Sequence, residues 1–93
     1  MSRAQSADCL AGLDALARGA WTDARDAFEA SLRVQETPEA LEGLGLAAWW
    51  LDRADLLFDS RERAYRLFLE RDEAAAAARL AVWIACQRSP EIA

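Results

Sequence analysis

Residues 37–51 constrain the fold of this chain more than any other stretch. They predict a helix with a sharp start, because Thr37 is a good N-cap and Pro38 takes the first helical position, where its missing N–H costs nothing. One side carries an apolar stripe at helical spacing: Leu41, Leu44, Ala48 and Leu51. The roughly opposite side carries Leu46, Trp49 and Trp50. Such a helix lies between two layers of helices or lines a groove that something fills.

Capping and turn signals predict four further helices, at about residues 3–18, 21–35, 52–71 and 72–88. Ser2 or Ser6 would cap the first helix, Gly19 would end it in the left-handed conformation, and Asp52 would cap the fourth. Pro90 ends the fifth helix and leaves residues 89–93 as a frayed tail. Alanine, leucine, arginine and glutamate dominate while β-branched residues are few, which favours helix over sheet. We therefore expect an all-α, antiparallel array of about five helices.

Helical periodicity also predicts which side chains turn inward. The second helix should bury Trp21, Ala24, Phe28, Ser31 and Leu32. The fourth should bury Ala54, Leu57, Ala64, Tyr65 and Phe68, with Arg61 interrupting the stripe. The fifth helix is nearly apolar all round over residues 80–86, so it does not resemble the polar end of a helical array.

Composition narrows the function. The 93 residues make one domain, and the net charge of −5 is unfavourable for binding a phosphate backbone. Cys9 and Cys86 fit free thiols in a reducing cytoplasm, with a disulfide between them as the less favoured alternative. We expect a cytoplasmic protein, because residues 1–7 lack the apolar core of a signal peptide and no apolar run is long enough to span a bilayer.

The sequence contains no arrangement typical of catalysis. It has no histidine, no nucleophile–base pairing, no phosphate-binding glycine loop and no metal-ligand spacing, so we expect no enzyme, cofactor or metal site. The acidic pairs Asp23/Asp26 and Asp52/Asp55 fall in first turns, where acids are simply favourable. The basic residues of the fourth helix alternate with acids and predict a solvated, ion-paired face: Arg61, Arg63, Arg66 and Arg71.

An internal repeat runs through the chain. At an offset of 33, Gly12-Leu13 recurs as Gly45-Leu46 and Ser31-Leu32 as Ala64-Tyr65. At an offset of 34, Leu46 recurs as Leu80 and Trp49 as Trp83. In period and helix–turn–helix form the chain resembles the tetratricopeptide repeat. The repeats would span residues 5–37 and 38–71, with a half repeat at 72–88.

Several positions carry that resemblance: Ala24, Phe28, Pro38, Leu41 and Leu44-Gly45. Others depart from the family pattern: Ala11, Leu57, Arg61 and Arg79. Two segments resemble more closely the repeat region that precedes the helix-turn-helix of bacterial LuxR-type regulators, namely residues 45–52 (GLAAWWLD) and 61–67 (RERAYRL). This resemblance implies the interaction or sensory part of a regulator, without the DNA-reading element.

The resemblance also implies a concave groove lined by the first helix of each unit. Its lining residues would be Leu13, Leu16, Glu42, Leu46, Trp49, Trp50, Leu80, Trp83 and Ile84, with Cys9 and Ala76 beside them. Trp49 and Trp83 could instead be ordinary core residues, and Trp50 is the best candidate for exposure. Glu39 and Glu42 would set the polarity of the rim.

These features predict a protein–protein interaction module whose apolar groove receives a partner helix or peptide. We expect a homodimer through the fifth helix and the concave face, and no binding to nucleic acid or membrane. The alternatives are a small-ligand sensor pocket between the first, third and fifth helices, acting on a regulator in trans, and a purely structural homodimer that fills the groove itself.

Overall fold

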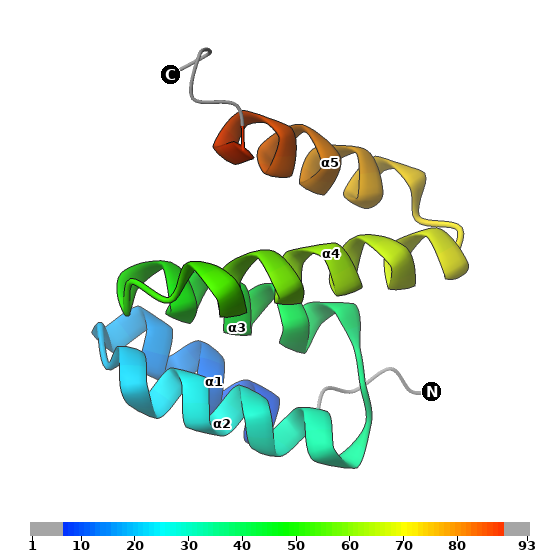
Figure 1. Ribbon diagram of the computed structural model, residues 1–93. Helices are drawn as coiled ribbons and strands as arrows, with labels where there is room; N and C mark the ends of the chain where they lie inside the picture. Colours follow the sequence, from blue (N-terminus) through cyan, green and yellow to red (C-terminus); the bar gives the residue numbers. More distant parts are fainter. Residues whose placement is uncertain (1–6, 89–93) are drawn as a thin grey trace.

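The computed structural model describes residues 7–88, which form five helices and no strand. The helices are α1 (Ala7–Arg18), α2 (Trp21–Val34), α3 (Pro38–Trp50), α4 (Ala54–Glu70) and α5 (Ala74–Arg88). They run antiparallel to their neighbours in sequence and are joined by short turns (Figure 1). The prediction of an all-α array of five helices is confirmed. The predicted caps Ser2 and Ser6 and the tail 89–93 lie outside the described residues.

The helices pack in chain order, and α3 is the central one. It contacts α1, α2 and α4, whereas the backbone of α5 comes close only to α4 (Figure 1). Between α3 and α5 the two backbones are therefore separated, although α1 and α3, which occupy equivalent places in the chain, are in direct contact. The space between α3 and α5 is filled by side chains, and it is there that the candidate site lies.

The start of α3 matches the sequence prediction. Thr37 is extended, and its hydroxyl oxygen accepts a hydrogen bond from the N–H of Ala40 at 3.3 Å, while Pro38 occupies the first turn. This side-chain bond satisfies one of the amides that a helix start leaves without a partner. The sequence therefore fixes where α3 begins and, with it, which residues face each side.

The starts of α4 and α5 correct the prediction. Asp52 and Asp72 are not N-caps; they have positive φ angles of 59° and 58° and end the preceding helices, so α4 begins at Ala54 and α5 at Ala74. After each, an N–H donates back to the last turn, as from Arg53 to the carbonyl of Ala48 at 2.9 Å. Aspartate tolerates this conformation better than most residues. Gly19, with φ 75°, makes the same turn after α1, as predicted.

The first core cluster is built around Phe28, which is fully buried. Its ring lies against two glycines on different helices. A Cβ on Gly12 of α1 would come within 2.7 Å of the ring, and a Cβ on Gly43 of α3 would come closer still. Glycine at both positions lets α1 and α3 close onto the ring from two sides. The other buried members are Cys9, Ala15, Ala24, Ala40, Leu44 and Ala47.

The second core cluster joins α3, α4 and α5. Its buried members are Leu41, Ala64, Phe68, Ala77 and Leu80, and Leu32 packs against both clusters. The predicted stripe of α4 is correct at Leu57, Ala64 and Phe68, all buried, but Ala54 is exposed. Packing onto Ala64 and Phe68 therefore attaches α5 to the array through only one of its sides.

Burial repeats along the chain with a spacing of 33 residues. Ser31 and Ala64 are both buried, and so are Leu44 and Ala77, and Ala47 and Leu80. The offset of 34 suggested for the third unit pairs Leu46, which is exposed, with Leu80, which is fully buried, so it is wrong. At the spacing of 33, Ala78 rather than Arg79 corresponds to Gly45.

Ion pairs on the solvated side connect α4 and α5 to the first half of α3 and the turn before it. Arg71 binds both carboxylate oxygens of Glu39 at 2.9 Å, and Arg63 pairs with Glu36 and Asp59. These two arginines confirm the predicted ion-paired face. The pairs are largely exposed, and such pairs contribute up to about 1 kcal/mol each.

The two cysteines are free thiols in different environments. Cys9 is buried in the first core cluster and Cys86 is exposed on α5. Burial, and secondarily the negative charge of Glu39, raises the pKa of the Cys9 thiol above its usual range. Cys9 therefore acts as a small core residue and does not line a groove.

We expect Gly43→Ala to destabilise the protein by about 1–3 kcal/mol, because the added methyl group overlaps the Phe28 ring. That strain exceeds the helix-propensity gain of about 0.8–1 kcal/mol. In a Phe28→Leu background the smaller side chain leaves room, so the same substitution should cost much less. Urea denaturation of the four proteins in this double-mutant cycle measures the difference; equal costs in both backgrounds would show that Phe28 does not set the spacing.

Candidate functional site: an aromatic groove between α3 and α5

All four tryptophans of the chain lie in ring contact at one region of the molecule. Trp21, at the start of α2, stacks on Trp50, at the end of α3, with ring centres 4.9 Å apart and an angle of 7°. The neighbouring Trp49 meets Trp83 of α5 edge to face at 6.2 Å. Because antiparallel helices bring the start of α2, the end of α3 and the second half of α5 together, residues far apart in sequence form one aromatic cluster.

The outward side of α3 is exposed, as the sequence predicts. Leu46, Trp49 and Trp50 are 40%, 47% and 55% accessible, while the Leu41 stripe on the other side is buried. Trp49 is therefore not an ordinary core residue. Trp83 is half-buried, since it also contacts Phe58 of α4 at 6.2 Å. Exposed tryptophans with apolar neighbours are typical of contact surfaces.

An open hollow of about 300 Å³ lies between α3 and α5. Its lining comprises Leu46, Trp49, Trp50, Arg61 and Trp83. A hollow of this size, open to solvent, receives a large side chain more readily than it encloses a whole small molecule, because ligand pockets bury most of their ligand.

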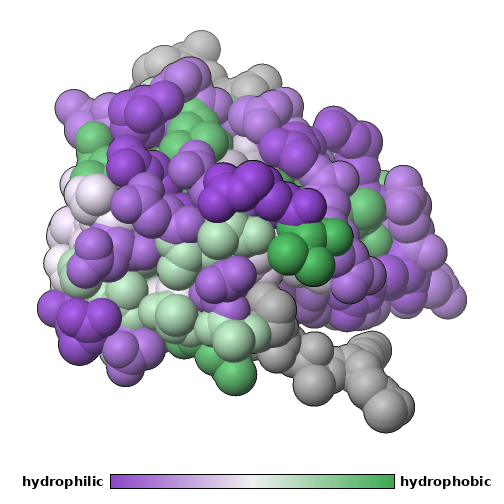
Figure 2. Space-filling view, turned by 90° about the horizontal axis from the view of Figure 1, so that it is seen from below, coloured by the Kyte–Doolittle hydropathy of each residue, from purple (hydrophilic) through white to green (hydrophobic). Residues whose placement is uncertain are grey.

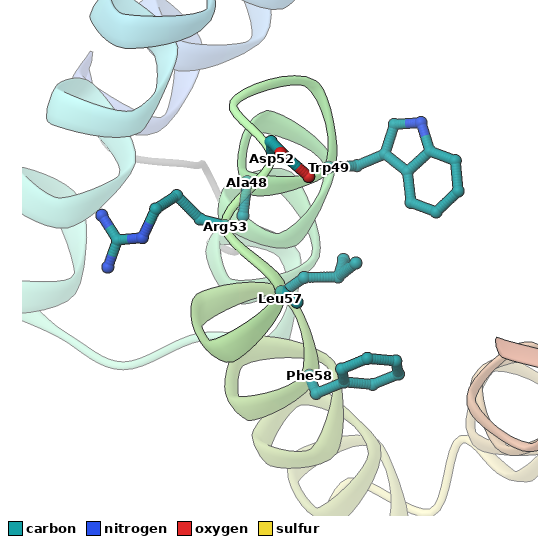
Figure 3. A pocket seen from close by; sticks show the side chains of 7 residues that line it. Ala48, Trp49, Asp52, Arg53, Leu57 and Phe58 are labelled. Carbon is teal, nitrogen blue, oxygen red and sulfur yellow. The ribbon is translucent and has the colours of Figure 1, made fainter. Parts of the chain in front are cut away.

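A second open hollow, of about 260 Å³, lies on the other side of Trp49, over the turn between α3 and α4. Its lining comprises Ala48, Trp49, Asp52, Arg53, Ala54, Leu57 and Phe58. In Figure 3, Trp49, Leu57 and Phe58 project to the same side, whereas Arg53 points the other way. The Trp49 ring thus forms a wall shared by two adjacent hollows. We call the two hollows together the aromatic groove.

Arg61 is the polar member of the groove, and its environment corrects the expectation of a solvated, ion-paired side chain. Its guanidinium carbon lies 4.4 Å from the centre of the Trp83 ring, a cation–π arrangement. Its Nε is buried without a hydrogen-bond partner, and burial lowers the pKa of the guanidinium. Leaving a buried donor unsatisfied costs about 1–3 kcal/mol.

The repeat explains how an arginine comes to be buried here. Arg61 stands 33 residues after Phe28, and it lies against Gly45 as Phe28 lies against Gly12. A Cβ on Gly45 would come within 2.8 Å of the Arg61 Nε. The second unit thus carries an arginine at the position that holds the central phenylalanine in the first.

The border of the groove near Arg61 contains a carboxylate that is already engaged. Glu42 of α3 accepts a hydrogen bond from Arg79 of α5 at 2.6 Å, and this pair bridges the two helices. Glu42 raises the pKa of Arg61 and Arg79 lowers it, so both act on the guanidinium through space. Two positive charges and one negative charge leave a local excess of one positive charge, on a protein whose net charge is −5.

Of the nine predicted groove residues, the structure brings four together around the first hollow: Leu46, Trp49, Trp50 and Trp83. Glu42 lies at its border, in the pair with Arg79. Leu80 is fully buried in the second core cluster and Leu16 packs against the first, so both are corrected to packing residues. Leu13 is exposed and Ile84 half-buried, and neither lines a hollow. Arg61, Phe58 and Trp21 were missed; of these, only Arg61 gave a signal, as a charge in an apolar stripe.

The face formed by α1 and α2 has a different character. Seen from below, it is mostly hydrophilic, and hydrophobic residues form separate small patches (Figure 2). Residues 7–88 contain no group of three or more potential ligand side chains that could hold a metal ion. Within the same residues, no helix is both long and apolar enough to cross a membrane.

Comparison of the chain with protein-family models, with curated proteins and with solved structures found no match. The functional argument therefore rests on the side chains of the aromatic groove.

Truncating Leu44 and truncating Trp50 should have different effects on stability. Leu44→Ala removes a buried core side chain and should cost about 2–5 kcal/mol. Trp50→Ala removes a half-exposed ring and should cost mainly its stacking on Trp21, about 0.5–1.5 kcal/mol. Urea denaturation followed by circular dichroism measures both changes, since tryptophan fluorescence would itself be altered; equal losses would place Trp50 in the core.

Proposed function

We propose that this protein is a non-catalytic interaction module whose aromatic groove docks an amphipathic helix or peptide of a partner protein. The observation that carries this proposal is the exposure of Trp49 and Trp50 at the edges of two open hollows. Large apolar rings left accessible to water mark contact surfaces, and tryptophan is among the residues that contribute most to binding.

The shape of the groove supports a peptide ligand over a small molecule. Two hollows on either side of Trp49 can accept two neighbouring anchor side chains, as a helix presents at positions i and i+3 or i+4. A small-ligand sensor pocket is less favoured, because neither hollow is enclosed. The resemblance of residues 45–52 and 61–67 to the repeat region of LuxR-type regulators, and of the whole array to tetratricopeptide repeats, suggests a bacterial regulatory setting.

Selecting a random peptide library on the purified protein tests the proposal. We expect enriched peptides to carry two bulky apolar residues three or four positions apart. Binding should quench or shift the tryptophan emission, since every tryptophan lies in the cluster. Trp49→Ala should weaken binding about tenfold or more, because it removes the wall shared by both hollows.

The matched control is Leu69→Ala, which removes an exposed apolar side chain of α4 outside both hollows and should leave affinity unchanged. Failure to enrich any peptide, or equal affinity for the wild type and the Trp49→Ala variant, would refute docking in this groove.

Self-association through α5 is a second candidate, favoured by the exposed side of that helix. At the spacing of 33, Ala78 and Ala81 correspond to Gly45 and Ala48, which α4 covers on α3. On α5 both alanines are exposed, and Val82 beside them is 64% accessible. A second copy of the chain in a symmetric dimer would cover this face.

We expect sedimentation at low micromolar concentration to show a dimer. Val82→Glu places a charge in the proposed interface and should shift the protein to monomer without unfolding it, since the side chain is exposed. A wild-type protein that sediments as a monomer would rule this candidate out, and would leave the groove proposal unaffected.

A further inference from the structure

We propose that Arg61, seated on Gly45, forms a carboxylate-binding subsite within the aromatic groove, so that the docked segment carries an acidic group beside its apolar anchor. This inference rests on the proposed docking function and names the chemistry of the partner. It depends on three observations: the position of the arginine, its unbalanced charge and its fixed orientation.

The position of Arg61 is one that favours an apolar side chain. Its counterpart Phe28 is fully buried against Gly12, and Arg61 makes the equivalent contact with Gly45. The aliphatic stem fits this place, but the guanidinium pays no part in the core contacts and its Nε has no acceptor. An arginine there weakens the packing of the free protein, and a bound acceptor would offset that loss.

The charge of Arg61 is not balanced by a neighbour. The nearest acidic group that acts on it, Glu42, is held by Arg79 at 2.6 Å, and no other carboxylate forms an ion pair with Arg61 in the part of the chain that the structure describes. By contrast, Arg63 and Arg71 on the same helix are each paired with two carboxylates. One unpaired guanidinium matches the single charge of a carboxylate better than the nearly double charge of a phosphate.

The orientation of Arg61 is fixed by its neighbours. The stem lies across Gly45 and the guanidinium lies over the Trp83 ring, so the group is held at the surface of the first hollow. A guanidinium held in one plane offers paired N–H donors that match a carboxylate, and surrounding apolar rings strengthen that pair by excluding water. A bulky side chain in the hollow would bring an adjacent carboxylate within reach.

Peptides from the library selection provide the test. We expect them to carry aspartate, glutamate or a free C-terminal carboxylate next to an anchor more often than the unselected library does. Replacing that acid by its amide should weaken binding to the wild type about tenfold, the effect of losing a charge-assisted hydrogen bond. On the Arg61→Met variant, which keeps an unbranched stem, acid and amide peptides should bind equally.

Gly45→Ala separates the position of Arg61 from its charge. The added methyl group would meet the Arg61 Nε, so this variant keeps the arginine but displaces it, and should also lose the preference for the acid peptide. Arg66→Met, which removes an exposed arginine of the same helix, should keep the full preference. Circular dichroism would confirm that each variant is folded.

The outcomes separate the two proposals. If no peptide is enriched, docking itself fails. If peptides bind and depend on Trp49 but acid and amide forms bind the wild type equally, the groove docks apolar segments and the carboxylate subsite is wrong. The subsite is also wrong if Arg61→Met keeps the preference for the acid.

Discussion

The packing of one phenylalanine between two glycines sets the spacing of the first three helices. Phe28 extends from α2 into a place where neither Gly12 of α1 nor Gly43 of α3 has a side chain. With the ring in place, α1 and α3 approach closely enough for their backbones to be in contact. The second unit repeats the arrangement with Arg61 on Gly45, and there the next helix stays apart from α3. The difference between a closed and an open part of the array thus coincides with one change of residue type at one repeated position.

The sequence predicted those parts of the fold that depend on local interactions. Thr37 and Pro38 mark the start of α3 through a cap that needs no distant partner, and the burial of Leu41 and Leu44 follows from the phase of that helix. The starts of α4 and α5 were predicted wrongly because aspartate serves both as an N-cap and in the left-handed turn that ends a helix. The turn at Asp52 closes through the carbonyl of Ala48, a bond between main-chain groups that side-chain signals do not reveal.

The aromatic groove could be predicted only in part, for a physical reason. Exposure of Trp49 and Trp50 follows from the phase of α3, but their ring partners depend on how α2, α4 and α5 pack. Periodicity alone gives Arg61 two outcomes, a solvated charge or a stem buried beside a glycine. Its contact with Gly45 decides between them, and that contact becomes visible only when the two units are superposed at the correct spacing. The error of one residue in the third unit likewise moved Leu80 from the core to the groove.

The groove is also what joins α5 to the centre of the array. The α5 backbone is close to α4 alone, and side chains make its links to α3: Trp83 to Trp49, and Arg79 to Glu42. Trp83 and Arg61 therefore belong both to the surface that a partner would contact and to the contacts that position α5. A segment docked between α3 and α5 would add apolar contacts to both helices at once. Because any ligand that binds only the folded state stabilises it, docking would strengthen the weakest connection of the array, and α5 would be the element whose position responds most to the partner.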